Sequence, residues 1–404
     1  MNPAPLQPRL GERGLFSELQ AVAYLNHAAI SPLSDPVRAA ARSALDDFAR
    51  QGSVGFGVRL SERQALREDL ARLLHAQPHE IALVPSTMYG LAALATSLPW
   101  RAGARVIVFE GEYPTNVTVW QRACERFGLQ LCSLPLSDYA GAAGPDLSRL
   151  ERELARGDVQ LCAASAVQFQ TGLRMPLADI ARLCHAHGAQ LAVDAVQALG
   201  STPFDVRALG VDYAAAGSHK WLMGLDGSGV LYIREDLLPA LQPAVAGAFS
   251  HVDSERIFTH AGELRYDRPL RNEARLFEGG MMSSVSTSAL GASVRILLEL
   301  GPERIHAHVN AYLDQLERGL LARGFTSLRA TDAARRSCIL GVLPPAGIEN
   351  ASRLASLLGT RDVVCSAPDG VLRFAPHFAN AHSEVDLVLE ALDQVLPAAA
   401  VRLR

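Results

Sequence analysis

The sequence predicts an α/β protein: a large domain with a mostly parallel sheet of seven strands, and a smaller C-terminal α+β domain. Seven short apolar runs lie between residues 80 and 233, and stretches with helical periodicity separate them. The runs are apolar along their length, which is typical of parallel strands covered by helices on both faces. After about residue 290 the alternation ends, and this change indicates a second domain.

The predicted strands are followed by helices of ordinary length. The strands span residues 80–85, 105–110, 129–135, 159–167, 190–196, 212–218 and 228–233. The clearest helix between them covers residues 176–188, because its apolar positions repeat with helical period and Gly188 suits the position just after a helix. A long helix is predicted over residues 286–301. We expect a large domain at residues 21–289 and a small domain at residues 290–404, joined by residues 1–20.

Composition argues against several classes of protein. The chain has 404 residues, 49% of them hydrophobic, and 38 basic against 42 acidic side chains give a net charge of −4. There is no basic excess to neutralise nucleic acid, and no apolar segment is long enough to span a membrane. Residues 1–16 lack the apolar stretch of a signal peptide. Six scattered cysteines without a Cys-x-x-Cys pair indicate reduced thiols, so we expect a cytoplasmic protein.

One basic residue differs from all the others. Of the 38 basic residues, Lys220 is the only lysine, and the other 37 are arginine. Arginine replaces lysine wherever a cation suffices, but its guanidinium stays protonated and cannot act as an amine nucleophile. A desolvated lysine can lose its proton and condense with a carbonyl group to form a Schiff base. A surface position would explain a single lysine equally simply, but its neighbourhood favours the chemical role.

Polar residues follow several predicted strands, where ligands of parallel sheets bind. Asp194 closes the run QLAVD, and Lys220 follows the next run by two residues. A Schiff-base lysine with an aspartate beside a protonated pyridine nitrogen is the arrangement that pyridoxal phosphate (PLP) requires. Ser86 and Thr87 precede a predicted helix, whose free N–H groups favour a phosphate, although ordinary N-capping explains these residues equally well.

Four motifs together resemble a known family. The segments YLNHAAISP, PSTMYG, VDAVQ and GSHKW occur in this order and are similar to the PLP-dependent class V aminotransferase family, which includes cysteine desulfurases and isopenicillin N epimerase-like proteins. The resemblance extends from Tyr24 to about Asp386. It implies the fold-type I architecture of PLP enzymes and a homodimer with active sites at the subunit interface.

The resemblance also implies roles for individual residues. Lys220 would form the Schiff base and Asp194 would pair with the pyridine nitrogen, while Tyr113 would stack on the cofactor ring. Gln197 and Gln168 would contact the phenolic oxygen of PLP. The phosphate would be held by a set of residues around the helix N-terminus and the lysine motif: Ser86, Thr87, the Met88 backbone, Ser218 and His219.

The substrate residues and the departures lie mainly towards the C-terminal end. Arg373 matches the family's clamp for the substrate carboxylate, for which a planar guanidinium is suited. His27 either reaches the substrate or is a structural histidine. Met281 stands where desulfurases bring a threonine from the neighbouring subunit, and Ser283, Ser284 or a backbone N–H would replace it. The cysteine-bearing loop of desulfurases is missing, so Cys365 is interpreted as a buried or turn thiol.

These observations predict a PLP-dependent enzyme that acts at the α-carbon of an amino acid. Aminotransfer is the first interpretation, with a desulfurase-like C–S lyase or an isopenicillin N-type epimerase as alternatives. A nicotinamide-dependent oxidoreductase is disfavoured because no Gly-x-Gly-x-x-Gly turn follows a strand. A scaffold without turnover would need neither Lys220 nor Arg373. No metal site is expected, because His185/His187 and His306/His308 place alternate residues on different helix faces.

Overall fold

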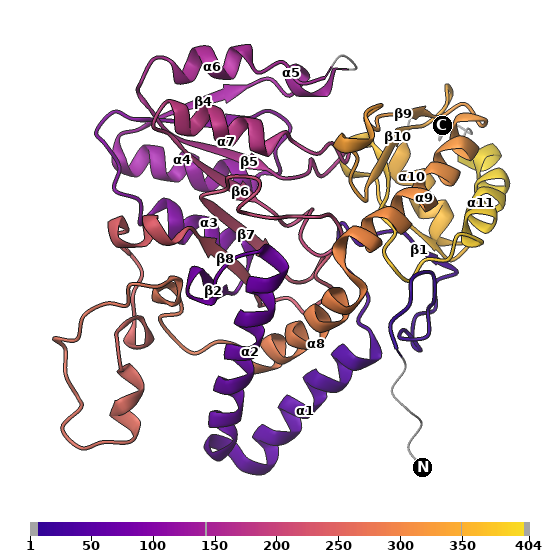
Figure 1. The fold of residues 1–404 in the computed structure, drawn as a ribbon. Coiled ribbons are helices and arrows are strands. Elements are labelled where there is room, and N and C mark those ends of the chain that lie inside the picture. Colours follow the sequence, from indigo (N-terminus) through magenta and orange to yellow (C-terminus); the bar gives the residue numbers. More distant parts are fainter. Residues whose placement is uncertain (1–6, 142–143, 349, 400–404) are drawn as a thin grey trace.

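The large domain is built on the seven-stranded sheet that the sequence predicts. A computed structural model describes residues 7–141, 144–348 and 350–399 (Figure 1). The strands are β2 (Ile81–Val84), β3 (Arg105–Phe109), β4 (Gln130–Leu134), β5 (Val159–Ser165), β6 (Gln190–Asp194), β7 (Tyr213–Gly217) and β8 (Gly229–Ile233). Their order across the sheet is β2-β8-β7-β6-β5-β3-β4, and only β8 runs antiparallel to its neighbours. The predicted class and strands are confirmed.

Helices cover both faces of this sheet because side chains alternate along each strand. In β3, Val106 and Val108 belong to one buried cluster and Ile107 and Phe109 to the other. One face is covered by α3 (Thr87–Ala95) and α4 (Thr115–Phe127). The other is covered by α2 (Phe56–Leu74), α6 (Ser148–Leu154) and α7 (Leu177–Ala186). The predicted helix over 176–188 is therefore α7.

A smaller domain follows the sheet. Its elements are α9 (Pro302–Leu321), β9 (Thr326–Ser327), β10 (Leu340–Leu343), α10 (Ala351–Gly359), β11 (Val363–Val364), β12 (Leu372–Phe374) and α11 (Glu384–Ala399). Strands β12, β10 and β9 form an antiparallel sheet, and β11 pairs with β1 (Ala23–Tyr24) from the beginning of the chain. The remaining helices are α1 (Asp35–Gln51), the short α5 (Ser137–Ala140) and α8 (Ser284–Leu300).

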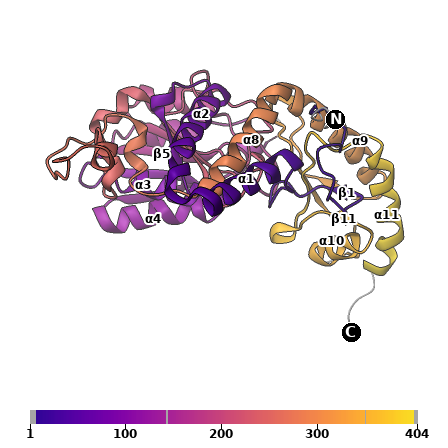
Figure 2. The ribbon, with the colours of Figure 1, turned by 90° about the horizontal axis from the view of Figure 1, so that it is seen from below.

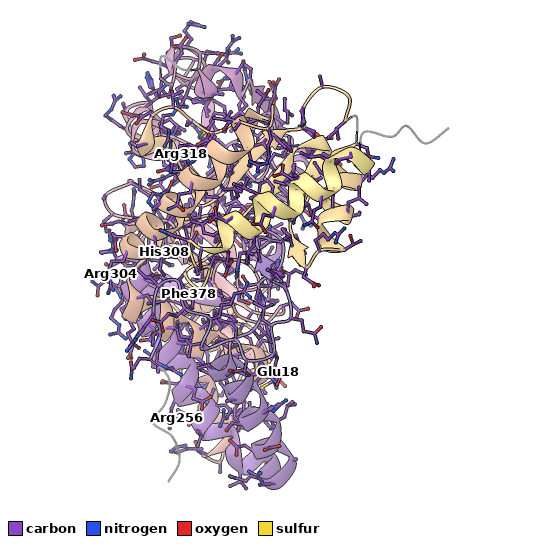
Figure 3. The ribbon with its side chains drawn as sticks, turned by 90° about the vertical axis from the view of Figure 1, so that its right-hand side faces the viewer. Glu18, Arg256, Arg304, His308, Arg318 and Phe378 are labelled. Atoms are coloured by element: carbon purple, nitrogen blue, oxygen red, sulfur yellow. The ribbon has the colours of Figure 1, made fainter. Side chains whose placement is uncertain are left out.

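The two domains are linked by helices and by the N-terminal segment. Helix α8, which corresponds to the predicted long helix, packs against α1 and α2, and Figure 2 shows α1 and α8 side by side. Gly11 N donates to the carbonyl oxygen of Phe378 at 2.6 Å, and the Phe16 ring lies 5.9 Å from the Phe378 ring. Phe378 belongs to the small domain, and Figure 3 labels it together with His308 of α9 from the same domain. The division at residue 289 stays a prediction, and α8 runs across that point.

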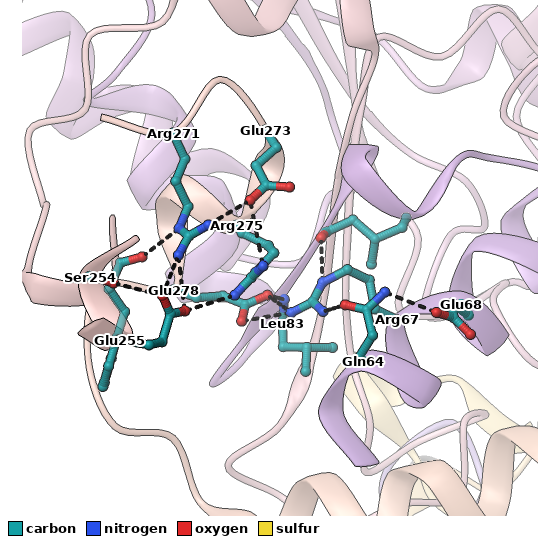
Figure 4. A network of polar contacts seen from close by, with 12 residues as sticks. Gln64, Arg67, Glu68, Leu83, Ser254, Glu255, Arg271, Glu273, Arg275 and Glu278 are labelled. Carbon is teal, nitrogen blue, oxygen red and sulfur yellow. Dashed lines mark hydrogen bonds and ion pairs between the residues drawn. The ribbon is translucent and has the colours of Figure 1, made fainter. Parts of the chain in front are cut away.

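An irregular segment, residues 245–283, extends from the large domain and is here called the arm (Figure 1). Figure 4 shows the ion pairs that hold it. Arg67 of α2 donates to both oxygens of Glu278, at 2.7 and 2.9 Å, and Leu83 N donates to the same carboxylate at 2.9 Å. Arg271 pairs with Glu255 at 2.9 Å within the arm. Among the described residues no helix is both long and apolar enough to cross a bilayer.

Candidate active site

A cavity of 420 Å³ opens at the carboxyl edge of the large sheet, next to residues of the small domain. Asp194 is the last residue of β6, Lys220 follows β7, and Thr87 begins the helix after β2. Because β2, β6 and β7 run in the same direction, these three residues meet at one edge. The lining residues are Ala28, Ala29, Ser86, Thr87, Met88, Tyr113, Thr115, Phe169, Asp194, Val196, Gln197, His219, Lys220, Pro368 and Arg373.

Lys220 extends into this cavity from the turn after β7. Its Nζ lies 5.4 Å from the centroid of the Tyr113 ring, and no ion pair to it is found in the described part of the chain. Burial lowers the pKa of Lys220, the nearby Asp194 carboxylate raises it, and the Arg373 cation lowers it further. A lysine amine with a lowered pKa loses its proton more readily and becomes a better nucleophile.

Asp194 is buried beside this lysine. Its side chain is held by Val196 N, which donates to Oδ1 at 2.9 Å. Burial raises the pKa of Asp194, while the Val196 N–H and Lys220 lower it. No donor to its second oxygen is found among the described residues, so that oxygen is free to accept a hydrogen bond from a ligand in the cavity.

The opposite end of the cavity is formed by the N-terminus of α3. Ser86 is the N-cap of this helix and its Oγ accepts from Tyr89 N at 3.1 Å. Thr87 Oγ1 accepts from Gly217 N at 2.8 Å. A Cβ atom at Gly217 would lie 3.3 Å from the His219 ring and 3.4 Å from Thr87 Oγ1. The absent side chain therefore keeps open a corner lined by helix N–H groups, Thr87 and His219, which suits a phosphate.

Gln197 and Tyr113 also line the cavity. Gln197 Oε1 accepts from Trp221 Nε1 at 2.8 Å, and Nε2 donates to Ala28 O at 3.0 Å. The second N–H of this amide remains for a ligand. The Tyr113 ring is half exposed and meets Phe169 edge-on, at 5.4 Å between ring centroids. These contacts fix both side chains at the cavity wall, and their contacts with a cofactor stay predictions.

Arg373 of β12 is a buried cation with no carboxylate partner among the described residues. Its side chain donates from Nη1 to Phe169 O at 2.7 Å and from Nε to Ser366 Oγ at 3.2 Å. No ion pair of this guanidinium is found in the described ranges, and burial lowers the pKa of Arg373 to about 10. A desolvated guanidinium gains from an anionic ligand, so Arg373 suits a carboxylate that enters the cavity.

Two predicted phosphate residues do not line the cavity. Ser218 is fully buried, and its hydroxyl donates to Leu225 O and is 2.9 Å from Ser228 Oγ. Ser283 caps α8, and its Oγ accepts from Ser286 N at 3.2 Å. Both hydroxyl groups are therefore used by local structure, and their phosphate contacts stay predictions. Met281, beside Ser283 on the arm, is 65% exposed.

His27 and Gln168 also lie outside the cavity lining. His27 is buried, and its Nδ1 is 2.8 Å from the hydroxyl of Ser31, which donates to the backbone oxygen of Lys220 at 2.5 Å. This histidine thus supports the turn that carries the lysine, which favours the structural alternative. Gln168 Nε2 is buried and has no hydrogen-bond partner in the described structure, so its predicted cofactor contact remains untested.

Several lining residues carried no signal in the sequence. Phe169 follows Gln168 and turns its backbone oxygen towards Arg373, while Pro368 reaches the cavity from the small domain. Ala28, Ala29, Thr115 and Val196 are the other additions. Ala28, Ala29 and Val196 belong to the YLNHAAISP and VDAVQ motifs, but nothing in the sequence marked these three residues as part of the cavity wall. Apolar and small side chains are common everywhere, so their role depends on the fold.

All six cysteines lie within the described ranges, and none lines the cavity. Cys365 is the one nearest in sequence to Arg373, and burial raises the pKa of its thiol to about 12. Such a thiol stays protonated and is a poor nucleophile. The expectation that Cys365 is a structural thiol is therefore consistent with its surroundings.

The residues around the cavity fit PLP. Asp194 offers a free carboxylate oxygen, Lys220 an amine, and the corner at Gly217 a place for a phosphate. When bound, PLP condenses with amines and withdraws electrons from the carbon attached to the amine nitrogen. The chain itself would supply the groups that orient the cofactor.

The chain is similar to known proteins along most of its length. An uncharacterised aminotransferase of Bacillus subtilis, YcbU, is 28% identical over 389 residues, or 95% of this chain and 96% of that protein. A probable cysteine desulfurase of Chlamydia trachomatis is 31% identical over 325 residues, or 76% of each chain. Among solved structures, the cystine C–S lyase C-DES in complex with cysteine persulfide has a TM-score of 0.83 at 22% identity and covers 92% of this chain and 97% of its own.

A second solved structure, the cysteine desulfurase CsdA of Escherichia coli, has a TM-score of 0.82 at 23% identity, with 96% of this chain and 98% of its own covered. Likeness at this identity shows the fold. The family model for aminotransferase class V matches residues 23–375, which is most of the chain. The chain therefore belongs to the class V aminotransferase family of PLP-dependent enzymes.

Proposed function

We propose that this chain is a PLP-dependent enzyme that acts at the α-carbon of an amino acid through Lys220. The observation that carries the proposal is the composition of the 420 Å³ cavity. It contains the only lysine of the chain, a buried aspartate with a free oxygen and a buried arginine without an acidic partner. This chemistry needs three groups: an amine that binds the cofactor, a carboxylate that pairs with the pyridine nitrogen, and a cation that binds the substrate carboxylate.

Each of the three residues has a distinct task. Arg373 would bind the α-carboxylate of the substrate and so fix the orientation of the substrate in the cavity. The Lys220 amine, once displaced by the substrate amine, accepts the α-proton as a general base. Asp194 would pair with the pyridine nitrogen and favour its protonated form, because a buried negative charge stabilises a positive charge beside it.

We propose transamination as the overall reaction. Lys220 would hold the proton taken from the α-carbon and deliver it again within the cavity, and PLP, when bound, would keep the amino group once water has released the keto acid. Its support is the likeness to YcbU along 95% of this chain and the absence of a thiol from the cavity lining. A desulfurase that loads sulfur onto its own cysteine needs a reactive thiolate at the substrate.

A second candidate is C–S lyase chemistry, which the curated cysteine desulfurases at 30–32% identity support. In this reaction the α-proton passes to Lys220, and the sulfur substituent leaves the β-carbon with its bonding electrons. Because no cysteine lines the cavity, the sulfur would be released to solution and not kept on the enzyme. Epimerisation is the third outcome that the same first step permits.

One experiment separates these outcomes. The purified PLP-bound protein is incubated with a panel of amino acids, cystine and cysteine included, and four products are measured: the pyridoxamine form of the cofactor, keto acid, sulfide or persulfide, and inverted amino acid. Pyridoxamine with keto acid supports transamination, and sulfide or persulfide with pyruvate supports the lyase. No turnover of any panel member, and no spectral change on mixing, would contradict the proposal.

We also propose that the chain works as a homodimer in the cytoplasm. Large apolar side chains on the arm are exposed, including Phe258 at 72%, Leu264 at 68% and Tyr266 at 91%. Exposed apolar residues on one segment are typical of a surface that a partner covers. The free cysteines suit a reducing compartment. Sedimentation of the purified protein tests the dimer directly.

A further inference from the structure

A second buried carboxyl group lies at the same sheet edge as Asp194, and the proposed reaction does not use it. Glu112 belongs to the turn between β3 and α4 and is 8% exposed. Its Oε1 accepts from Ser165 N at 2.7 Å, and its Oε2 accepts from Ser165 Oγ. No cation pairs with it among the described residues. A carboxyl group that is buried without a cation is costly to ionise.

Ser165 connects this group to Asp194. Ser165 is the last residue of β5 and pairs in register with Asp194, the last residue of β6. The next residue along the chain, Ala166, donates its N–H to the carbonyl oxygen of Asp194 at 2.9 Å. The two hydrogen bonds to Glu112 thus hold the end of β5 against the strand end that carries the cofactor aspartate.

The charges around Glu112 come from a few elements. On β6 the Asp194 carboxylate acts on it, on β5 the buried thiol of Cys162 interacts with it, and from α4 it meets the neutral amide of Asn116. Burial raises the pKa of Glu112 to about 7, the Ser165 hydrogen bonds and the nearby Asn116 amide lower it, and Asp194 raises it. Its charge therefore changes near neutral pH.

We propose that Glu112 is a positioning residue that, through Ser165, holds Asp194 in place and sets the negative charge behind the pyridine nitrogen. The inference rests on the proposed function, because Asp194 must face the cofactor. When Glu112 loses its proton, a second negative charge lies near Asp194 in a medium of low dielectric constant. This negative charge raises the proton affinity of the pyridine nitrogen. It also raises the proton affinity of the linkage between the cofactor and Lys220.

The test is a pH titration of the visible band of the PLP-bound protein, which reports the protonated linkage to Lys220. Glu112→Gln keeps the shape of the side chain and removes the charge. We expect its titration midpoint to fall by roughly one pH unit relative to the wild-type protein, while the spectra agree below pH 6. Ser165→Ala removes one donor to Glu112 and should shift the midpoint in the same direction by less.

The matched control is Glu110→Gln, which removes an exposed carboxylate two residues away and should leave the midpoint unchanged. A residue with only a packing role would lower the unfolding temperature without moving this midpoint. Wild-type and Glu112→Gln proteins with the same midpoint would overturn the inference alone. Absence of any visible band in the wild-type protein with added PLP would overturn the proposed function and the inference with it.

The cofactor-free protein gives an independent readout of Glu112. A group with a raised pKa stabilises the fold fully below its unfolded pKa, and that contribution is lost as the pH rises through the folded pKa. The unfolding temperature of the wild-type protein should therefore decline between pH 5 and 7 more steeply than that of Glu112→Gln. Parallel curves for the two proteins would contradict the charge that the inference assigns to Glu112.

Discussion

Arg373 Nη1 donates a hydrogen bond to the carbonyl oxygen of Phe169, 2.7 Å away. The donor lies on β12 of the small domain and the acceptor lies in the turn after β5 of the large sheet. This bond crosses between the two domains at the cavity and orients the guanidinium towards Lys220, whose pKa it lowers. The proposed substrate clamp and the proposed cofactor lysine thus lie on opposite sides of the predicted domain division, and their distance depends on how the two parts of the chain pack.

Replacing Arg373 with alanine should weaken substrate binding and leave the cofactor in place. Loss of a charge-assisted pair costs about 1.5–3 kcal/mol, so we expect KM for amino acids to rise by roughly 10- to 100-fold. PLP occupancy, measured by absorbance, should be nearly unchanged. Arg361→Ala removes an exposed arginine of the same domain and serves as the control. An unaltered KM in Arg373→Ala would reject the clamp.

Lys220→Arg should keep the positive charge and abolish the visible cofactor band, because a guanidinium forms no Schiff base. In the wild-type protein, borohydride reduction should attach the cofactor to one peptide only, since the chain has a single lysine. Mass spectrometry of the digested protein identifies that peptide. A reduced cofactor on any other peptide would refute the assignment.

The rate at which PLP binds the cofactor-free protein should depend on pH through Lys220. Burial lowers the pKa of this amine, so the neutral, reactive form is present at lower pH than for an ordinary lysine, and the rate should reach its plateau earlier. Asp194→Asn removes the group that raises this pKa and should move the midpoint further down. Arg373→Gln removes a repelling cation and should move it up. Stopped-flow absorbance measures each midpoint. A midpoint that rises in Asp194→Asn, or one that falls in Arg373→Gln, would contradict the electrostatic account.

The attachment of the arm to α2 should depend on the ion pair between Arg67 and Glu278 (Figure 4). Arg67 is 3% exposed, and the side chain of Glu278 is 12% exposed. Arg67→Met leaves a poorly solvated carboxylate without its cation, so we expect a loss of about 3 kcal/mol in the free energy of unfolding. Arg72→Met, on the same helix, removes an arginine whose side chain is 68% exposed and should cost little. Equal losses in denaturant titrations of both variants would contradict this role.

Much of the fold was predictable because its signals are local. Apolar runs and helical periodicity located β2 to β8, α7 and α8, with ends that differ by a few residues. The strand order and the antiparallel insertion of β8 between β2 and β7 were not predictable. A run of apolar residues predicts a strand but does not indicate which strand lies beside it. The strand order depends on how the connections cross the sheet.

The site divides in the same way. Motifs located Lys220, Asp194, Thr87 and Arg373, and the structure brings all four to one cavity. The same motifs also singled out Ser218, His27 and Gln168, whose side chains lie outside the cavity lining, and Ser283, whose expected role is at the site of the neighbouring subunit and stays a prediction. Whether a hydroxyl or imidazole faces a ligand or a neighbouring backbone group is decided by side-chain direction, which a motif does not encode.

The chemistry of the single amine follows from the sequence alone, because only lysine can supply it and the chain has one. The alternation of apolar runs likewise determined the class of fold. The tertiary structure alone decided that Arg373 reaches across from the small domain and that Glu112 lies buried behind Ser165 and Asp194. Residues far apart in the chain come close to one another only when the chain folds. Folding also removes the water around them, and this burial shifts their pKa values and so decides their charge.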